Sequence, residues 1–204
     1  MDTRPLAWLA AVLVAVLLTS SYWIWRLRRL NAKLHHLSRS DALTGLYNRT
    51  GFNEAMNHEL ARAKRSGHAL SVILLDIDFF KRINDQLGHD VGDAVLRDLA
   101  TQLRTVVRHV DILVRWGGEE FLVICPATQL QQAVVLAERV LEAVRTHTFG
   151  IPWPLTISAG LASLQPGQSA DTLFAQADAA LLQAKQLGRD RLVVFDPKEI
   201  SPWP

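Results

Sequence analysis

Arg115-Trp-Gly-Gly-Glu-Glu-Phe121 lies between two apolar runs, Ile112-Leu-Val114 and Phe121-Leu-Val-Ile-Cys125. Two β-prone runs on either side of paired glycines predict a hairpin, because glycine supplies the positive φ of a tight turn. Gly117 and Gly118 also let a phosphate approach the backbone closely. A carboxylate beside them is useful only when a cation stands between it and the phosphate. Taken alone, the motif is more often an ordinary acidic hairpin, so the rest of the chain decides.

The N-terminal part contains an apolar segment, residues 6–25, that carries no charged residue. About twenty apolar residues are needed for a helix to cross a bilayer. Basic residues and no acid follow the segment: Arg26, Arg28, Arg29, Lys33 and Arg39. We therefore predict a short tail at 1–5 and a transmembrane helix at 6–25, with its C-terminal side in the cytoplasm. A cleaved signal peptide is the alternative, and the dense arginines fit it poorly.

Residues 26–40 are predicted to form a basic helical stalk. The apolar residues of this segment recur at intervals of three and four, as in a coiled-coil seam: Leu27, Leu30, Leu34 and Leu37. This spacing favours a parallel homodimer. A basic helix lying against anionic lipid is the alternative, and both can hold.

The overall charge of +2 is too small to indicate nucleic-acid binding. Cys125 is the only cysteine, so an intrachain disulfide is excluded. Its place in an apolar run predicts a buried small hydrophobe rather than a reactive thiol. The seven histidines show no spacing typical of a zinc site.

Helical and strand patterns alternate from Asp41 onward. Asn48 is expected to cap a helix that runs to about Arg65 and that Gly67 ends. The other expected helices cover 90–108, 128–146 and 170–187, and strands are expected at 70–77, in the hairpin, at 155–162 and at 192–195. This order predicts an α/β sandwich with a central, mostly antiparallel sheet flanked by helices.

The strand at 70–77 is apolar until it reaches Asp76 and Asp78. A carboxylate at the end of a buried strand is costly unless it binds something. If the hairpin pairs beside this strand, Glu119 stands next to Asp76. Two carboxylates from different elements predict a Mg²⁺ site that a nucleotide phosphate completes, with Mn²⁺ as the alternative ion.

The residues that follow this strand favour a nucleotide. Lys81 offers a positive charge close to the acids. Asn84 and Asp93 are suited to the donor-rich edge of guanine, since a carboxylate accepts from both N1–H and the 2-amino group. Adenine lacks that pair of donors. The residues therefore predict a nucleotide and metal site, with guanine indicated.

Several ordered motifs make the chain similar to the GGDEF family of diguanylate cyclases over about Asp41 to Phe195. The motifs are Asp41-Ala-Leu-Thr-Gly-Leu-Tyr-Asn-Arg49, Leu75-Asp-Ile-Asp78 with Phe80 and Lys81, Asn84-Asp85 with Gly88-His89 and Gly92-Asp93, Arg115 with Gly117-Gly-Glu-Glu-Phe121, and Ala177-Asp178 with Lys185, Gly188 and Arg189. The resemblance implies a catalytic domain at 41–198, followed by a tail at 199–204. It also implies a fold like that of nucleotide cyclases and polymerase palms.

The resemblance implies a Mg²⁺-dependent condensation of two GTP into cyclic di-3′,5′-GMP, with release of two pyrophosphates. It makes Asp76, the Ile77 carbonyl and Glu119 the metal ligands, and Glu119, Glu120 and Lys81 the catalytic group. It assigns the remaining substrate contacts to Phe80, Asn84, His89, Asp93, Gly117, Gly118, Lys185 and Arg189. Each domain would hold one GTP, so the active form would be a homodimer. With the predicted anchor, the location implied is the bacterial inner membrane, with the domain in the cytoplasm.

Arg108-His-Val-Asp111 resembles the family's inhibitory site for the product, and Arg139 stands where a second arginine is often supplied. A surface ion pair at a helix end is the alternative reading.

The chain departs from the family pattern at two positions. Leu182 replaces a usual tyrosine, which suggests a packing change, and Asp190 replaces a usual asparagine near the expected phosphate contacts. A catalytically silent module that binds cyclic di-GMP or GTP is the main alternative function, and a related enzyme that uses ATP is another.

Overall fold

The computed structural model describes residues 16–26 and 39–196. Contacts divide the chain into two units, Met1–Ser38 and Arg39–Pro204. In the first unit, residues 16–26 are helical. No helix within the described ranges is both long and apolar enough to cross a membrane, so they do not support the expected transmembrane helix. Residues 6–15 of that span and 27–38 of the expected stalk lie outside the described residues.

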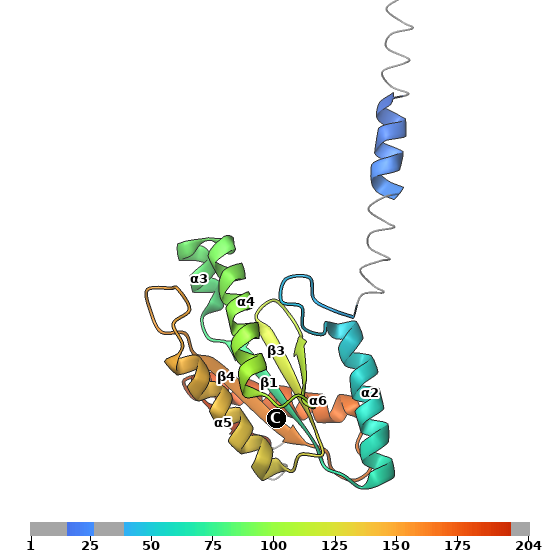
Figure 1. The fold of residues 1–204 in the computed structure, drawn as a ribbon, viewed down its shortest axis with the longest axis vertical. Coiled ribbons are helices and arrows are strands. Elements are labelled where there is room, and N and C mark those ends of the chain that lie inside the picture. The colour runs from blue at the N-terminus through green and yellow to red at the C-terminus, as the bar shows by residue number, and fades with distance from the viewer. Residues whose placement is uncertain (1–15, 27–38, 197–204) are drawn as a thin grey trace, which may run out of the picture. The chain divides into compact units, whose positions relative to one another are not determined.

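The second unit is built on one sheet with the strand order β2-β3-β1-β4-β5 (Figure 1). The strands are β1 (Leu70–Ile77), β2 (Ile112–Arg115), β3 (Glu120–Pro126), β4 (Ile157–Ser163) and β5 (Leu192–Val194). β1 pairs antiparallel with β3 and β4, β2 pairs antiparallel with β3, and only β5 runs parallel to its neighbour β4. The predicted hairpin and the mostly antiparallel sheet are confirmed.

The helices of this unit are α2 (Arg49–Ser66), α3 (Phe80–Leu87), α4 (His89–Val106), α5 (Leu130–Thr146) and α6 (Ala170–Gln186). Asn48 caps α2, because its side chain accepts from the backbone N–H groups of Thr50 and Gly51. Gly67 ends α2 in the left-handed conformation, with φ 70°. These ends confirm the predicted helix. α3 was not predicted, since it is short and buries only Phe80 and Ile83.

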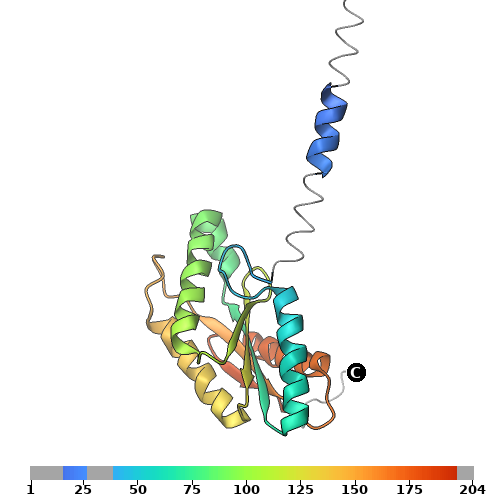
Figure 2. The ribbon, with the colours of Figure 1, turned by 45° about the vertical axis from the view of Figure 1, so that its right-hand side comes forward.

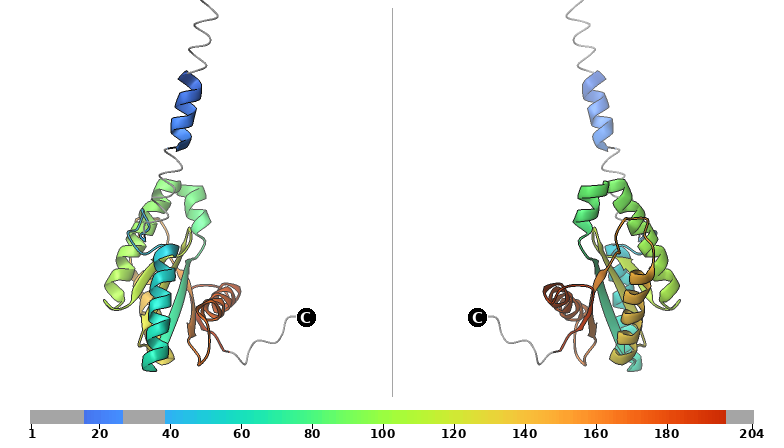
Figure 3. Two further views of the ribbon diagram at one scale, coloured as in Figure 1. Left: turned by 90° about the vertical axis from the view of Figure 1, so that its right-hand side faces the viewer. Right: turned by 90° about the vertical axis from the view of Figure 1, so that its left-hand side faces the viewer.

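Helices cover both faces of the sheet. All of β1 is buried, so it shows no polar alternation in sequence. Its odd-numbered residues Ile73, Leu75 and Ile77 pack in one core with α4 and α5. Its even-numbered residues Val72 and Leu74 pack in a second core with α2 and α6. Figures 2 and 3 show α4 and α5 on one side of the sheet and α6 on the other.

Two single-residue expectations have different outcomes. Cys125 is fully buried in β3, and burial raises the pKa of its thiol, so the predicted small hydrophobe is confirmed. Leu182 on α6 is 53% exposed. The packing interpretation of Leu182 is therefore wrong, because the side chain faces away from both cores.

Gly160 lets α6 lie directly on β4. A Cβ at this position would stand 2.1 Å from the carbonyl oxygen of Ala177 and 2.3 Å from the backbone nitrogen of Leu181. Because these atoms belong to a helix backbone, they cannot move aside as a flexible side chain can. We predict that Gly160→Ala destabilises the domain by about 2 kcal/mol, the cost of an overpacked core. Thermal denaturation should show Tm lowered by roughly 4–8 °C.

Gly118→Ala is the matched control for Gly160→Ala. It adds the same methyl group where no atom lies within 4 Å. Its Tm should stay close to that of the parent chain, and equal Tm values for the two variants would contradict the packing argument.

Candidate active site

Carboxylates from two strands meet a lysine at the end of β1. The register of β1 with β3 sets Asp76 opposite Glu120. The backbone N–H of Ile77 donates to the carbonyl of Glu119 at 3.3 Å. From α6, Lys185 Nζ lies 2.8 Å from Asp76 Oδ2. The expected meeting of Asp76 with the hairpin acids is therefore observed, and it leaves Asp76 paired with Lys185.

The acids at this site are costly to ionise together. Burial raises the pKa of Asp76, although Lys185 opposes this shift. Burial, and then the charge of Asp76, raise the pKa values of both Glu119 and Glu120. A bound cation would relieve this repulsion. The carboxylates of Asp76 and Glu119 with the carbonyl of Ile77 are hard oxygen donors and fit Mg²⁺.

No group of three or more His, Cys, Asp or Glu side chains within the described ranges is arranged to hold a metal ion. Two carboxylates and one carbonyl supply only part of the coordination shell of a divalent ion. A divalent ion there would therefore need oxygens from its substrate to complete its coordination.

We predict that Mg²⁺ stabilises the domain in a pH-dependent way. Raised pKa values mean that the folded chain holds these protons more tightly than the unfolded chain. Without metal, stability should therefore fall as pH rises from the ordinary values, 3.8 for Asp and 4.5 for Glu, through the raised ones. Mg²⁺ binds the deprotonated acids, and at about ten times its Kd it should add about 1.4 kcal/mol.

Thermal denaturation with and without Mg²⁺, at neutral pH and near pH 4, checks this prediction. The gain in Tm should be present at neutral pH and should vanish near pH 4, where protons occupy the carboxylates. A gain of equal size at both pH values would contradict it.

The glycines of the hairpin do not form the predicted tight turn, and only Gly117 is needed to avoid a clash within the loop. Neither Gly117 nor Gly118 has a φ in the left-handed region, so the predicted positive-φ turn is wrong. The backbone N–H groups of Trp116 and Gly117 both donate to the carbonyl of Glu120, at 2.8 and 3.2 Å, which closes a wider loop. A Cβ on Gly117 would stand 2.5 Å from Glu120 Oε2, whereas Gly118 faces open space.

Arg115 fixes this loop, a role that the sequence did not indicate. Its Nη2 donates to the Gly118 carbonyl at 2.8 Å, and its Nη1 contacts both Asp41 carboxylate oxygens at 3.1 and 3.2 Å. Burial acts against ionisation of Asp41, but hydrogen bonds from Thr44 and Arg115 hold the pKa of Asp41 below its ordinary value. The pair joins residues 74 positions apart, so only the fold could reveal it.

An aromatic cluster supports the same loop from the side. The Trp116 ring packs against Phe52 and Phe174, with centroids 4.9 and 4.5 Å away. The guanidinium of Arg49 lies over the Trp116 ring, 4.3 Å from its centroid. Trp116, the residue before the two glycines, is thus held in place by side chains of α2 and α6.

The residues assigned to guanine lie on α3 and α4. Asn84 stands next to Gly92, where a Cβ would be 2.0 Å from Asn84 Oδ1. Asp93 follows Gly92 and is half-buried, and His89 is exposed at the start of α4. Phe80 is only 5% exposed and belongs to the core, so it offers a substrate its main chain alone.

The positive residues assigned to phosphate come from α3 and from the end of α6. Lys81 is exposed in the first turn of α3. Arg189 lies in the turn after α6, and its guanidinium carbon is 4.5 Å from the centroid of the Phe79 ring. Lys185 is bound to Asp76 rather than turned to solvent.

Asp190 does not add an unpaired negative charge near the phosphate contacts, contrary to the sequence argument. Arg145 Nε donates to Asp190 Oδ1 at 2.8 Å, and Arg145 Nη2 donates to the Asp190 carbonyl at 2.8 Å. This pair neutralises the carboxylate and ties the turn to α5.

Asp78 has a structural role. Its two oxygens accept from the hydroxyls of Thr156 and Ser158, both at 2.7 Å, and from the backbone N–H of Asp190 at 3.1 Å. Asp78 therefore orients its neighbours, and Asp76 is the acid at the end of β1 that faces Lys185.

Arg108 and Asp111 line a separate cavity of about 520 Å³ near the start of β2. Asp111 is buried, and its Oδ2 accepts from the Arg108 backbone N–H at 2.8 Å. Its Oδ1 is buried and has no hydrogen-bond partner among the residues that the structure describes. Arg139 reaches from α5 to the Val106 carbonyl at 3.1 Å, two residues before Arg108.

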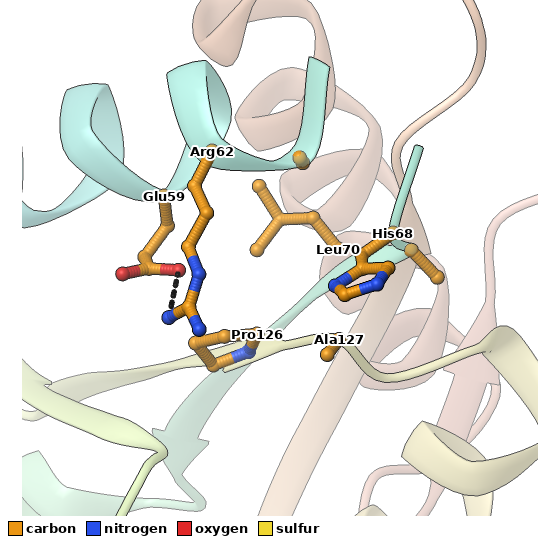
Figure 4. Close-up of a pocket in the computed structure, with 8 residues that line it drawn as sticks. Glu59, Arg62, His68, Leu70, Pro126 and Ala127 are labelled. Atoms are coloured by element: carbon orange, nitrogen blue, oxygen red, sulfur yellow. Dashed lines mark ion pairs between the residues drawn. The ribbon is translucent and has the colours of Figure 1, made fainter. Parts of the chain in front are cut away.

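A smaller pocket lies at the opposite end of β1 from Asp76 (Figure 4). Glu59, Arg62, His68 and Leu70 line it, with Glu59 and Arg62 paired at 3.7 Å. Its volume of about 10 Å³ is enough for a single water, which excludes it as a nucleotide site.

Comparison with known proteins is consistent with this geometry. Residues 38–191 match the family model described as "Diguanylate cyclase, GGDEF domain". Diguanylate cyclase DgcP of Pseudomonas aeruginosa is 44% identical over 158 residues, which are 76% of this chain and 24% of that protein. Cyclic di-GMP phosphodiesterase NbdA of the same organism is 35% identical over 95% of this chain and 28% of that protein. The chain thus spans about a quarter of the length of these relatives.

Among solved structures, the coiled coil and GGDEF domain of DgcB from Caulobacter crescentus, in complex with c-di-GMP, aligns with a TM-score of 0.75. It is 30% identical, and the alignment covers 89% of this chain and 98% of that one. The family model spans strands β1 to β4 and helices α2 to α6, and it ends one residue before β5. The chain belongs to the GGDEF family of diguanylate cyclase domains.

Proposed function

We propose that this chain is a diguanylate cyclase that condenses two GTP into cyclic di-3′,5′-GMP and releases two pyrophosphates. The observation that carries this proposal is the meeting of Asp76, Glu119 and Glu120 with Lys185 at the end of β1. A domain that only binds nucleotide has no need for this costly set of acids. Membership in the family and the similarity to DgcP support the same activity.

In this proposal each residue acts on one part of GTP. Asn84, His89 and Asp93 hold the guanosine, and Lys81, Lys185 and Arg189 hold the phosphates. The backbone beside Gly117 and Gly118, together with that of Phe80, approaches the triphosphate closely. Lys185 exchanges Asp76 for a phosphate oxygen when the nucleotide enters.

Glu119 accepts the proton of the 3′-hydroxyl as general base. Glu120 supports it. A Mg²⁺ ion bound by Asp76, the Ile77 carbonyl and Glu119 would supply charge stabilisation of the reacting phosphate.

The reaction requires two copies of the chain. Each domain holds one GTP, and the two-fold symmetry of the product matches that of a C2 homodimer. Because each hydroxyl must meet the phosphate of the other GTP, proximity is the main contribution to the rate.

Incubation of the chain with GTP and Mg²⁺, and separately with ATP, tests the activity. Chromatography with a cyclic di-GMP standard should detect product in the incubation with GTP and none in the incubation with ATP. Product from ATP would identify a different nucleotide cyclase. Binding of GTP or cyclic di-GMP by a dimeric preparation that yields no product would identify the silent binding module.

We also propose that product bound at Arg108 and Asp111, with Arg139 beside them, inhibits the enzyme. The unpartnered Asp111 Oδ1 and the adjoining cavity support this proposal, since a buried carboxylate oxygen without a donor is expected to bind one.

We predict that Arg108→Ala leaves the initial rate within about twofold and removes the late slowing of product formation. The substitution removes a cation from the product site and nothing from the end of β1. Progress curves recorded with and without added cyclic di-GMP measure both the initial rate and the slowing. Inhibition by product bound at a site should reach a limit once that site is full. Slowing that persists in the variant would contradict the role of Arg108.

Finally, we propose that residues 6–25 anchor the chain in the bacterial inner membrane and that residues 26–40 promote pairing of two domains in the cytoplasm. The uncharged apolar segment and the leucine spacing support this proposal. Membrane fractionation of the full chain tests the anchor. Activity with and without residues 1–40, at matched concentration, tests the pairing; equal activity would count against it.

A further inference from the structure

The turn that follows α6 is held in a conformation that its own residues disfavour. Arg189 has φ 63° and Asp190 has φ 47°, both in the left-handed region. Side chains other than glycine adopt this region at a cost, so two in succession persist only when the surroundings hold them.

Two neighbouring elements hold this turn. Arg145 of α5 binds both the carboxylate and the carbonyl of Asp190, each at 2.8 Å, which is a forked contact on one residue. Asp78 at the end of β1 accepts from the Asp190 backbone N–H at 3.1 Å. The backbone of Asp190 is therefore fixed between α5 and β1.

Phe79 holds the side chain of Arg189. The Phe79 ring is 62% exposed and contributes to neither core, and its own φ of 57° is unfavourable for a large residue. The Arg189 guanidinium lies 4.5 Å from the ring centroid, within the range of a cation–π contact. From there its positive charge also acts on Asp76, so the guanidinium lies within electrostatic range of the acids at the end of β1.

We infer that Phe79 and Arg145 are positioning residues that preorganise Arg189 for the phosphates of a nucleoside triphosphate. Arg145 sets the backbone through Asp190, and Phe79 sets the guanidinium. A long side chain that is ordered before binding loses less entropy when it meets its ligand. The inference rests on the proposed use of GTP and adds to it two residues that contact no reacting atom.

Substitutions at both positions test the inference, with KM and kcat for GTP and the Kd for GMP as readouts. Phe79→Leu removes the ring, and Phe79→Tyr keeps it as the matched control. Arg145→Gln removes the forked contact, and Asp190→Asn keeps an acceptor at the same place. GMP lacks the β- and γ-phosphates, so its affinity reports on the contacts to guanosine and the α-phosphate without those to the outer phosphates.

We expect Phe79→Leu to raise the KM for GTP about fourfold, as loss of an exposed cation–π contact would. We expect Arg145→Gln to raise it about tenfold, because the backbone of the turn is also released. Phe79→Tyr and Asp190→Asn should stay within about twofold of the parent chain. The Kd for GMP and kcat at saturating GTP should change little in all four variants.

Equal weakening of GTP and GMP would show a general structural effect and overturn the inference. Unchanged GTP parameters in Phe79→Leu and Arg145→Gln would overturn it as well. If the parent chain forms no cyclic di-GMP, the proposed function fails. The Kd values for GTP and GMP, measured by calorimetry, then still test the inference. Weakening of GTP alone in Phe79→Leu would then support it.

Discussion

Replacement of Glu119 by Gln should lower kcat by about a thousandfold or more, the effect expected when a general base and a metal ligand are lost together. The substitution keeps the size of the side chain and removes its charge. GTP should still bind, because the residues assigned to guanine and to the phosphates are untouched. The measurement is the initial rate of cyclic di-GMP formation at saturating GTP and Mg²⁺.

The same substitution should stabilise the chain in the absence of metal. Burial and the charge of Asp76 raise the pKa of Glu119, so its ionised form is unfavourable in the folded state at neutral pH. Gln carries no charge and avoids this repulsion. Tm without Mg²⁺ should therefore rise, and the gain on adding Mg²⁺ should shrink.

Glu54→Gln is the matched control for Glu119→Gln, since Glu54 is half-exposed and pairs with Arg39 in a surface contact. It should alter neither the rate nor the response to Mg²⁺. A kcat for Glu119→Gln within tenfold of the control would contradict the assignment of Glu119 as the base.

Most of the fold followed from the sequence because its signals are local. The apolar run of β1, the Asn48 cap and the glycine stop after α2 each depend on a few neighbouring residues, and each is found as predicted. α3 was missed because it is only eight residues long, a run of about two turns in which a helical pattern is hard to recognise. The positive φ predicted for the hairpin glycines was wrong because the loop closes through two hydrogen bonds to the Glu120 carbonyl instead of through a two-residue turn.

The site was predictable in its residue types and less so in its contacts. The strand register confirms that Asp76 meets the acids of the hairpin. No sequence pattern indicated that Lys185 would bind Asp76, that Arg115 would hold the loop through Asp41, or that Arg145 would neutralise Asp190. Each contact joins segments that are distant in sequence, and the family motifs mark the residues without marking their partners.

The proposed contact of Asn84 with guanine depends on Gly92 for a reason that only the structure provides. In α4, an Ala at Gly92 would place its Cβ 2.0 Å from Asn84 Oδ1, the free end of a flexible side chain. Asn84 can turn away, and the ring of Phe80, 3.3 Å from the same Cβ, needs to shift by only a few tenths of an ångström, so the clash need not distort the backbone. Alanine also favours a helix interior over glycine by about 0.5–1 kcal/mol. Gly92→Ala should therefore leave Tm unchanged or raise it while it displaces Asn84.

We accordingly predict that Gly92→Ala raises the KM for GTP about thirtyfold, the loss expected when a base edge loses its partner in a part-buried site. The effect should run through Asn84 alone, which a double-mutant cycle can decide. Asn84→Ala should raise KM to a similar extent, and Gly92→Ala added to Asn84→Ala should change it by no more than about twofold. Independent, multiplying effects would show that the methyl group acts through the Phe80 ring or disturbs α3 or α4 as a whole, because the clash with the Asn84 amide disappears in Asn84→Ala.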